Sequence, residues 1–367
     1  MDINKLIYGI GVAVFAGLIA FVLTPLASLI AHKTKAIDVP NDNRRIHKVP
    51  IPLLGGLAIW AAFVITSLLF CELNTTLKVV LIGGSVIVLA GFLDDIFDLN
   101  FILKFAFEIG AAFVAVALNV VIDHIDIFSH RIEFGVLSVP ITVLWIVGLT
   151  NAINLIDGLD GLACGVSAIC CLSLMTISFL MGMYEYAMML AILAGSCFGF
   201  LPFNHYPARI FMGDTGSLFL GYSLAIFSIQ GLFKMHAVIS FVVPVFLFAL
   251  PLSDTIFAFV RRLVKRQNPF KADKLHLHHR LMKMGFNQRQ TVSILYAISG
   301  LLGTTSVMYT RESISKSSLS VVVCVILLGI YLWILKDPGR RIRAGFDLHL
   351  PHEEEKPNDT KNDFESK

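Results

Sequence analysis

The chain is organised around Asn151-Ala-Ile-Asn-Leu-Ile-Asp-Gly-Leu-Asp-Gly161, a stretch that sets two carboxylates between two long apolar runs. Asp157 and Asp160 are three residues apart, so they share a face if the segment is helical. Carboxylates beside a bilayer cost free energy unless a cation or a substrate requires them. Two other stretches have the same character, Gly91-Phe-Leu-Asp-Asp95 and Phe211-Met-Gly-Asp-Thr-Gly-Ser217. These acids indicate a functional site beside a membrane.

The composition is that of a polytopic membrane protein. Of the 367 residues, 56% are hydrophobic and 15% are charged, whereas about a quarter of the residues of a soluble domain are charged. Apolar stretches long enough to cross a bilayer number about eleven. They lie at residues 6–30, 53–71, 77–93, 103–121, 137–153, 161–181, 185–202, 216–233, 237–260, 291–309 and 318–336. Pro244 and Pro251 are expected to kink or break the ninth stretch.

We therefore predict an all-α membrane protein with about eleven transmembrane helices. Residues 1–340 form a single integral-membrane domain, and residues 341–367 form a cytoplasmic, polar and acidic tail that we expect to be disordered. The outer loop 119–136 alternates polar and apolar residues, which is typical of a small hairpin. The sequence shows no internal repeat of the kind that many transporters contain.

Basic residues predict the orientation of the chain. When the loops are assigned alternately to two sides, one set holds 23 of the 29 Lys and Arg residues and the other holds 6. Cytoplasmic loops carry the excess of Lys and Arg, so the N-terminus is expected outside and the C-terminus inside. The acids of all three motifs fall on the more basic side. The sequence therefore predicts a cleft on the cytoplasmic face.

Six carboxylates are expected in this cleft, namely Asp94, Asp95, Asp98, Asp157, Asp160 and Asp214. Like charges at close range do not all ionise cheaply without a cation. Carboxylates without accompanying cysteines favour Mg²⁺ or Mn²⁺ over zinc, and Mg²⁺ commonly bridges one or two of them to the phosphates of a substrate. The alternative is that each acid caps a helix at the membrane boundary, and this alternative is strongest for Asp98.

Basic residues and histidines on the same side indicate phosphate binding. Lys48 precedes a Pro- and Gly-rich loop where the backbone can approach a ligand, and Lys104 lies just beyond the first acidic motif. His276, His278 and His279 fall within four residues. Such histidines bind phosphate or transfer protons; a zinc site is the alternative, and no cysteine supports it. Together these features indicate a cleft where a phosphorylated or nucleotide substrate meets a lipid.

These motifs resemble those of the polyprenyl-phosphate N-acetylhexosamine-1-phosphate transferase superfamily, over roughly residues 1–340. The resemblance rests on Gly91-Phe-Leu-Asp-Asp95, the Asn151–Gly161 stretch, Phe211-Met-Gly-Asp-Thr-Gly-Ser217 and His276-Leu-His-His279, in the expected order. The segment from Asn268 to Phe286 and Asp38-Val-Pro-Asn41 are similar to the bacterial branch that transfers GlcNAc-1-phosphate to undecaprenyl phosphate. The sister branch, the muramoyl-pentapeptide transferases, usually has a different histidine stretch and ten spans.

The resemblance implies a reaction in which UDP-GlcNAc and undecaprenyl phosphate give GlcNAc-pyrophosphoryl-undecaprenol and UMP. It implies a multi-pass enzyme of the bacterial plasma (inner) membrane with its active site in the cytoplasm. The product would prime O-antigen, enterobacterial common antigen or wall teichoic acid. Mg²⁺ is the implied cofactor, with Mn²⁺ as the alternative. The implied partners are the two substrates and the lipid bilayer; no nucleic-acid partner is expected, and a homodimer is compatible with such an enzyme.

The resemblance also implies roles for individual residues. Asp214 would ligate the metal, and Asp94, with Asp95 beside it, would deprotonate the lipid phosphate. Asp157 and Asp160 would position nucleotide and metal within the catalytic group. The implied substrate-binding residues are Lys48, Asp98, Lys104, Asn151, Asn154, Asn204, Phe211, His276, His278 and His279. Among these, Phe211 would stack on uracil and Lys104 would hold the lipid phosphate.

Three alternatives to this reaction stay open. The first is the same chemistry with UDP-GalNAc, a 6-deoxy-N-acetyl sugar or UDP-MurNAc-pentapeptide. The second is a covalent phospho-enzyme formed on an aspartate, in place of direct attack by the lipid phosphate. The third is a cation-coupled transporter, which would place carboxylates near the bilayer midplane in repeated halves, whereas these acids gather on one face.

Overall fold

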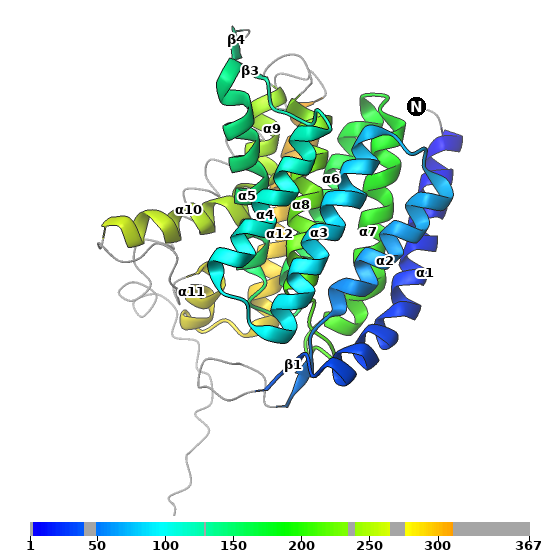
Figure 1. Ribbon diagram of the computed structural model, residues 1–367, viewed down its shortest axis with the longest axis vertical. Helices are drawn as coiled ribbons and strands as arrows, with labels where there is room; N and C mark the ends of the chain where they lie inside the picture. Colours follow the sequence, from blue (N-terminus) through cyan, green and yellow to red (C-terminus); the bar gives the residue numbers. More distant parts are fainter. Residues whose placement is uncertain (1–2, 40–48, 128–129, 234–238, 265–275, 311–367) are drawn as a thin grey trace, which may run out of the picture.

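A bundle of helices with two short β ribbons makes up the computed structural model (Figure 1). The structure describes residues 3–39, 49–127, 130–233, 239–264 and 276–310. The helices are α1 (Ile3–Thr34), α2 (Gly55–Phe70), α3 (Thr75–Phe97), α4 (Phe101–Ala117), α5 (Ser138–Ile156), α6 (Leu162–Leu180), α7 (Tyr184–Asn204), α8 (Gly213–Ser228), α9 (Ile239–Leu247), α10 (Ala249–Val264), α11 (Leu277–Lys283) and α12 (Gln288–Tyr309).

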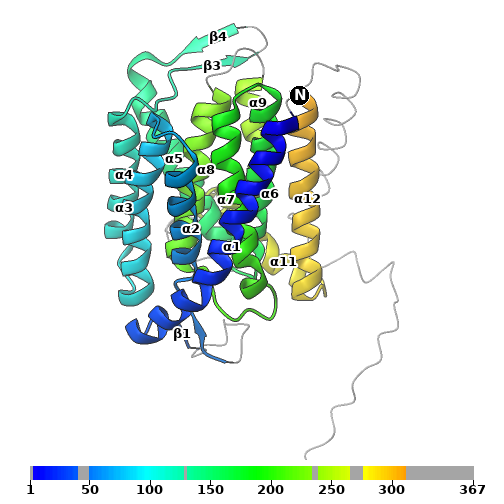
Figure 2. The same cartoon turned by 90° about the vertical axis from the view of Figure 1, so that its right-hand side faces the viewer.

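The two β ribbons lie at opposite ends of the bundle, as Figure 2 shows. One pairs β1 (Ile37–Asp38) with β2 (Ile51–Pro52), and the other pairs β3 (His124–Ile127) with β4 (His130–Glu133), both antiparallel. The second ribbon confirms the hairpin predicted within residues 119–136. The first ribbon shapes the link between α1 and α2 at the end of the bundle that holds the acidic motifs.

Helices long and apolar enough to cross a membrane dominate the part of the chain that the structure describes. Six meet both criteria: α1, α3, α5 with the turn before it, α6, α7 and α12. The apolar helix α2 has 16 residues, α4 has 17, and α8 has 16 before a single π turn continues it. The protein is therefore a multi-pass membrane protein. The count of about eleven spans stays a prediction, and the last predicted span, 318–336, and the tail lie outside the described residues.

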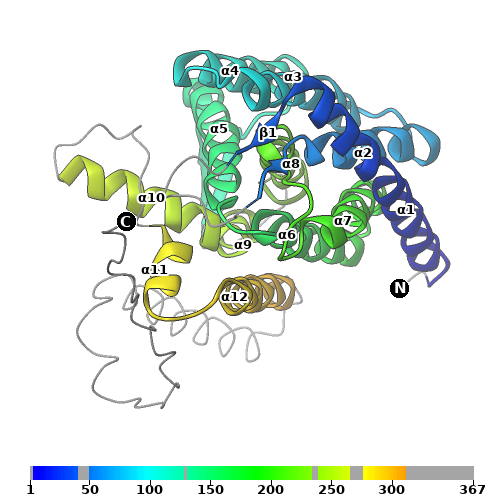
Figure 3. The same cartoon turned by 90° about the horizontal axis from the view of Figure 1, so that it is seen from below.

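The ninth apolar stretch is broken, as its two prolines predict, and it is not a single span. It forms α9 and α10, which meet at Phe248. Pro251 has no N–H to donate to the carbonyl of Leu247, one turn earlier; the Cys170 thiol, 3.7 Å away, contacts that oxygen instead. The 16 residues of α10 reach about 24 Å, less than the roughly 30 Å of a hydrocarbon core. In Figures 1 and 3, α10 leaves the bundle sideways.

Helix α8 lies at the centre of the bundle, inside a ring that includes α2, α3, α5 and α6 (Figure 3). Every residue from Thr215 to Ser228 is buried. Its first turn packs backbone against backbone: a Cβ added at Gly91 of α3 would lie 2.4 Å from the Thr215 nitrogen. Only glycine permits so close an approach. The start of α8, and with it Asp214, is therefore held at a fixed place.

Candidate active site

A cleft with a volume of about 970 Å³ opens at the end of the bundle where α3 and α5 end and α8 begins. It contains most of the residues that the sequence predicts for the site. Those that line it are Asp94, Asp95, Asp98, Asn154, Asp157, Asp160, Asn204, Phe211, Asp214 and His279. The acids of three motifs that are far apart in sequence therefore share one cavity, as predicted.

Asp95 is fully engaged in holding the first turn of α8. One carboxylate oxygen accepts the Asp214 N–H at 2.9 Å, and the other accepts the Thr215 N–H at 3.1 Å and the Thr215 hydroxyl at 2.6 Å. The first N–H groups of a helix have no partner within the helix, and the positive end of its dipole favours a negative charge. Asp95 thus caps α8 from a neighbouring helix and fixes the backbone that carries Asp214.

Asp214 is held by one amide and one ammonium group. The Asn154 side chain donates to its Oδ1 at 2.8 Å and also to the Ser217 hydroxyl at 2.8 Å. Lys104 of α4 pairs with the other oxygen of Asp214, and its Nζ lies 3.4 Å from Asp94. Asp94 also accepts the Leu99 N–H at 2.9 Å. Lys104 therefore bridges the predicted base Asp94 and the predicted metal ligand Asp214.

Asp157 differs from these acids because no group of the described residues donates a hydrogen bond to its carboxylate. It directly follows α5 and lines the cleft. Burial raises its pKa to about 7, and the nearby carboxylates of Asp95 and Asp160 add to the rise. Asp160, in contrast, accepts the Ala208 N–H at 2.9 Å. Among the acids of the cleft, a half-buried carboxylate without a hydrogen-bond donor is the one most in need of an added cation.

The donor set fits a hard divalent cation shared with a substrate. Within the described residues no three acidic, histidine or cysteine side chains come close enough to form a metal site by themselves. Mg²⁺ needs no such cage, since it usually keeps several waters and takes one or two carboxylates plus substrate phosphates. Asp157 and Asp214 are the carboxylates best suited to this, because neither is used to cap a helix as Asp95 is.

Of the predicted substrate-binding residues that the structure describes, four do not line the cleft: Asn151, Lys104, His276 and His278. Asn151 lies behind it, where its amide pairs with the buried Glu108 of α4 and donates to the Val147 carbonyl at 2.9 Å. Asn151 does not line the cavity, whereas Asn154, one turn later, does. Direct substrate binding by Asn151 stays a prediction that this position does not favour. Lys104 touches the cleft acids without lining the cavity. Lys48 lies outside the described residues.

The three histidines separate into different environments. His279 lines the cleft, whereas His276 and His278 are 5% and 3% exposed and do not line it. Burial lowers the pKa of His278 to about 3, and the neighbouring His279 adds to the fall. His278 is therefore neutral at ordinary pH, and its buried position outside the cleft does not favour its predicted role in holding a phosphate. No zinc ligand set forms among the described residues.

Asn204 and Phe211 connect the loops of the cleft. The Asn204 side chain accepts the Gly161 N–H and donates to the Ile210 carbonyl, each at 3.1 Å. Phe211 donates its N–H to the Pro52 carbonyl at 2.8 Å and accepts the Gly55 N–H at 2.9 Å. Asn204 is therefore a support for the Asn151–Gly161 stretch, while Phe211 lines the cavity.

The sequence reasoning missed four residues of this region. Gln288 and Lys35 line the cleft, and Glu108 and Asp254 are buried carboxylates, 2% and 5% exposed, close to predicted site residues. A signal existed for the last two, because each is the only acid in a long apolar run. Ionisable residues in such runs indicate function by default.

Comparison with known proteins agrees with the motifs and the cleft. Residues 77–232 match glycosyl transferase family 4. A probable undecaprenyl-phosphate N-acetylglucosaminyl 1-phosphate transferase of Bacillus subtilis (strain 168) is 37% identical, with 85% of this chain and 88% of the relative aligned. This chain belongs to the polyprenyl-phosphate N-acetylhexosamine-1-phosphate transferases. It is thus a membrane enzyme that transfers a phospho-sugar.

Two further relatives show how wide this transferase family is. The undecaprenyl-phosphate alpha-N-acetylglucosaminyl 1-phosphate transferase of Thermotoga maritima is 33% identical over 88% of this chain and 97% of its own length. The phospho-N-acetylmuramoyl-pentapeptide-transferase of Clostridioides difficile (strain 630) is 31% identical over 84% of this chain and 98% of its own length. The transferase therefore resembles enzymes named for two different sugars.

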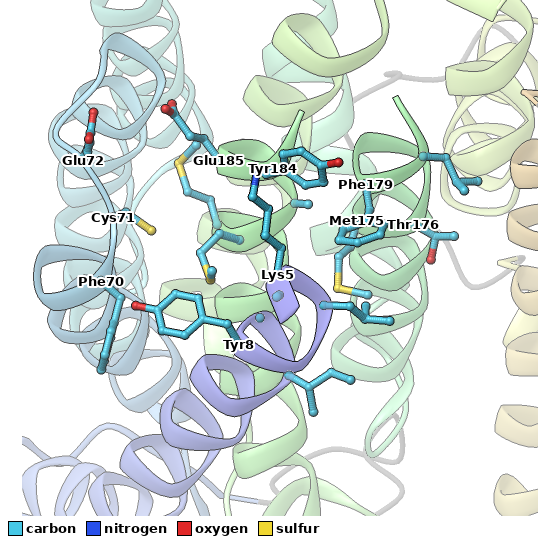
Figure 4. A pocket seen from close by; sticks show the side chains of 18 of the residues that line it. Lys5, Tyr8, Phe70, Cys71, Glu72, Met175, Thr176, Phe179, Tyr184 and Glu185 are labelled. Carbon is cyan, nitrogen blue, oxygen red and sulfur yellow. The ribbon is translucent and has the colours of Figure 1, made fainter. Parts of the chain in front are cut away.

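A second cavity of about 390 Å³ lies at the opposite end of the transferase, between α1, α6, α7 and the link after α2 (Figure 4). Its lining is largely apolar. Lys5 lies over the Tyr184 ring, with Nζ 4.0 Å from the ring centroid, and Asn74 donates to Glu185 at 3.0 Å. It brings together neither the predicted acids nor the histidines, so it is not the candidate active site.

Proposed function

We propose that this transferase moves GlcNAc-1-phosphate from UDP-GlcNAc to undecaprenyl phosphate, releasing UMP, at the cytoplasmic face of a bacterial plasma membrane. The observation that carries the proposal is the cleft at one end of a membrane bundle that Asp157 and Asp214 both line, with Lys104 paired to Asp214 beside it. Two carboxylates suit a divalent cation on a pyrophosphate, and an ammonium group suits a lipid phosphate. The relatives named for N-acetylglucosamine support the choice of sugar.

The nucleotide sugar would lie along the wall formed by the ends of α5 and α7. Asp157 and Asp214 would hold Mg²⁺, which when bound would neutralise charge on the pyrophosphate. Asn154 would keep the Asp214 carboxylate oriented through its 2.8 Å hydrogen bond. Phe211 would stack on uracil, and His279 would contact a phosphate, since both line the cleft. These residues supply position and charge, which dominate catalysis of phosphoryl transfer.

The lipid phosphate would enter beside Lys104 and Asp94. An oxygen of the lipid phosphate forms a bond to the β-phosphorus, while the bond from that phosphorus to the bridging oxygen breaks and UMP leaves. Lys104 would pair with the incoming phosphate, and Asp94 would take its remaining proton. Because the second pKa of a phosphate monoester is about 6, most of the lipid phosphate has already lost that proton. We therefore favour direct attack over a covalent enzyme intermediate.

The test is UMP release by the purified protein in detergent with undecaprenyl phosphate, Mg²⁺ and a panel of UDP-sugars. We expect release with UDP-GlcNAc and loss of activity on chelation of the metal. Asp214→Asn should lower the rate by on the order of a hundredfold or more, whereas Asp123→Asn, an exposed acid at the other end, should not. Absence of UMP release with every sugar would remove the proposal and revive the transporter alternative.

The same chemistry on UDP-MurNAc-pentapeptide is the second candidate, and the similarity to the Clostridioides difficile relative favours it. The two candidates differ in the sugar and not in the cleft acids. UMP release with UDP-MurNAc-pentapeptide and not with UDP-GlcNAc would decide for the second. Mass spectrometry of the protein during turnover tests the alternative in which an aspartate forms a covalent phospho-enzyme. We expect no sugar-phosphate adduct in the wild type or in Asp94→Asn.

A further inference from the structure

Asp254 of α10 is a buried carboxylate that the proposed reaction does not use. It is 5% exposed, and with Leu250, Pro251 and Ala258 it forms the buried stripe of a helix that otherwise presents apolar side chains outward. An acid in this position costs free energy unless its oxygens are satisfied. The partners that satisfy them show what the residue does.

Both oxygens of Asp254 point at the start of α11. One accepts the Leu277 N–H at 3.0 Å, and the other accepts from His276 Nδ1 at 3.0 Å. His276 occupies the N-cap position of α11, and its own side chain caps no N–H of that helix. Asp254 therefore supplies, from another helix, the acceptor that this helix start lacks. It also fixes the orientation of the His276 ring, with the proton on Nδ1.

Helix α11 in turn places two histidines against the active site. The ring of His276 stacks on His278 at a centroid distance of 5.9 Å and an interplanar angle of 4°, and His278 lies 4.3 Å from His279. His278 packs so closely on the loop after Asp157 that a Cβ at Gly158 would meet its Nε2 at 2.5 Å. His279 then reaches the wall of the cleft. A continuous set of contacts runs from Asp254 to the cleft.

We propose that Asp254 is a positioning residue, which anchors α11 so that His278 supports the Asp157–Gly158 loop and His279 faces the substrate. The assignment rests on the proposed function, because it is the substrate phosphates that His279 would contact. Asp254 touches no reacting atom itself. Its removal should therefore weaken the contribution of His279 and of the loop, and should leave the other contacts of the cleft intact.

Three substitutions separate this role from ordinary stabilisation. Asp254→Ala removes both acceptors, and Asp254→Leu does so while filling the buried space, which protects folding if the alanine variant is unstable. Asp254→Asn keeps an acceptor for Leu277, and its amide can donate to His276 Nδ1 after the ring proton moves to Nε2. Thr255→Ala is the matched control, because among the described residues the Thr255 hydroxyl bonds only the Pro251 carbonyl of its own helix, at 3.0 Å.

The kinetic readout is a double-mutant cycle with His279→Ala on UMP release. We expect Asp254→Ala or Asp254→Leu to raise KM for the UDP-sugar by about tenfold in the wild-type background. The rise should be clearly smaller in the His279→Ala background, where only the contribution of the loop is left to lose, since residues of one network are coupled. Asp254→Asn should restore KM to within a few-fold of the wild type, and Thr255→Ala should not change it. Unchanged KM in folded Asp254→Ala or Asp254→Leu, or effects that simply multiply, would overturn the assignment.

A second readout does not depend on the reaction. Diethyl pyrocarbonate modifies accessible histidines, and His276 and His278 should be protected in the wild type because they are buried. Mass spectrometry should detect modification of both in Asp254→Leu and protection in Asp254→Asn and Thr255→Ala. If the wild type releases no UMP but this pattern appears, the proposed function fails while the anchoring of α11 stands. If His276 and His278 stay protected in Asp254→Leu, the anchoring is wrong whatever the activity.

Discussion

The six acids of the cleft differ in what already holds them. Asp95 accepts three hydrogen bonds from the start of α8, while Asp157 accepts none from the described residues. The sequence was sufficient to predict that these acids meet, because their motifs fall at span ends on one side. The sequence does not show which of these carboxylates hold a helix in place and which remain available for a ligand. That difference depends on which backbone N–H groups the neighbouring helices bring within about 3 Å of each carboxylate. The same limit explains why Asn151 was predicted to bind substrate and instead pairs with Glu108.

The raised pKa of Asp157 leads to a pH dependence of stability. The pKa is about 7 in the folded protein, through burial and then through Asp95 and Asp160, and about 3.9 in the unfolded chain. Between these values the folded state holds a proton that the unfolded state has lost, so stability falls as pH rises from about 4 to about 7. Thermal unfolding in detergent with a chelator should show this fall, and Asp157→Asn should reduce it.

The matched control for this measurement is Asp123→Asn, which changes an acid whose side chain is 66% exposed at the other end of the bundle. It should keep the wild-type slope of melting temperature against pH. A slope in Asp157→Asn equal to that of the wild type would show that Asp157 is ionised in the folded protein throughout this range. Added Mg²⁺ should flatten the wild-type slope as well, because a bound cation favours the charged carboxylate.

The relative positions of the helices in this bundle depend on a few close contacts between helix backbones. Hydropathy and the two prolines were enough to predict where α1 to α8 and α12 lie along the chain and where the ninth stretch breaks. They carry no information about which helices cross, and the central place of α8 was not predicted. The motif Gly91-Phe-Leu-Asp-Asp95 draws attention in the sequence through its acids, whereas the missing side chain of Gly91 is what lets α3 approach Thr215.

Gly91→Ala should therefore damage both stability and activity. The added methyl carbon would lie 2.4 Å from the Thr215 nitrogen, so α3 and α8 must separate, and such overpacking typically costs about 1–3 kcal/mol. The shift would move Asp214 relative to Asp157 and lower UMP release. Gly110→Ala in α4 is the control, because a Cβ at this position meets nothing within 4 Å. This variant should raise the free energy of unfolding by up to about 1 kcal/mol. Equal melting temperatures for the two variants would contradict this account.

In the molecule as a whole, every predicted catalytic acid lies at one end of the helix bundle. The opposite end carries the β3–β4 ribbon and the largely apolar second cavity (Figures 2 and 4). Basic residues in the sequence predict that the cleft end is cytoplasmic, because it belongs to the side with 23 of the 29 Lys and Arg residues. UDP-sugars and UMP are soluble cytoplasmic compounds in the proposed reaction. The proposed function therefore requires that the cleft end of the bundle faces the cytoplasm.

Labelling of single cysteines tests this orientation directly. Val136 is 94% exposed at the β3–β4 end, and Val49 is 63% exposed at the cleft. In a Cys71→Ser, Cys324→Ser background, a membrane-impermeant maleimide should label Val136→Cys in intact spheroplasts and Val49→Cys only after the membrane is opened. The remaining cysteines, at 164, 170, 171 and 197, are buried and should stay unlabelled, because a maleimide needs an accessible thiolate. Labelling of Val49→Cys in intact spheroplasts would place the cleft outside, where no nucleotide sugar is supplied, and would contradict orientation and proposed function together.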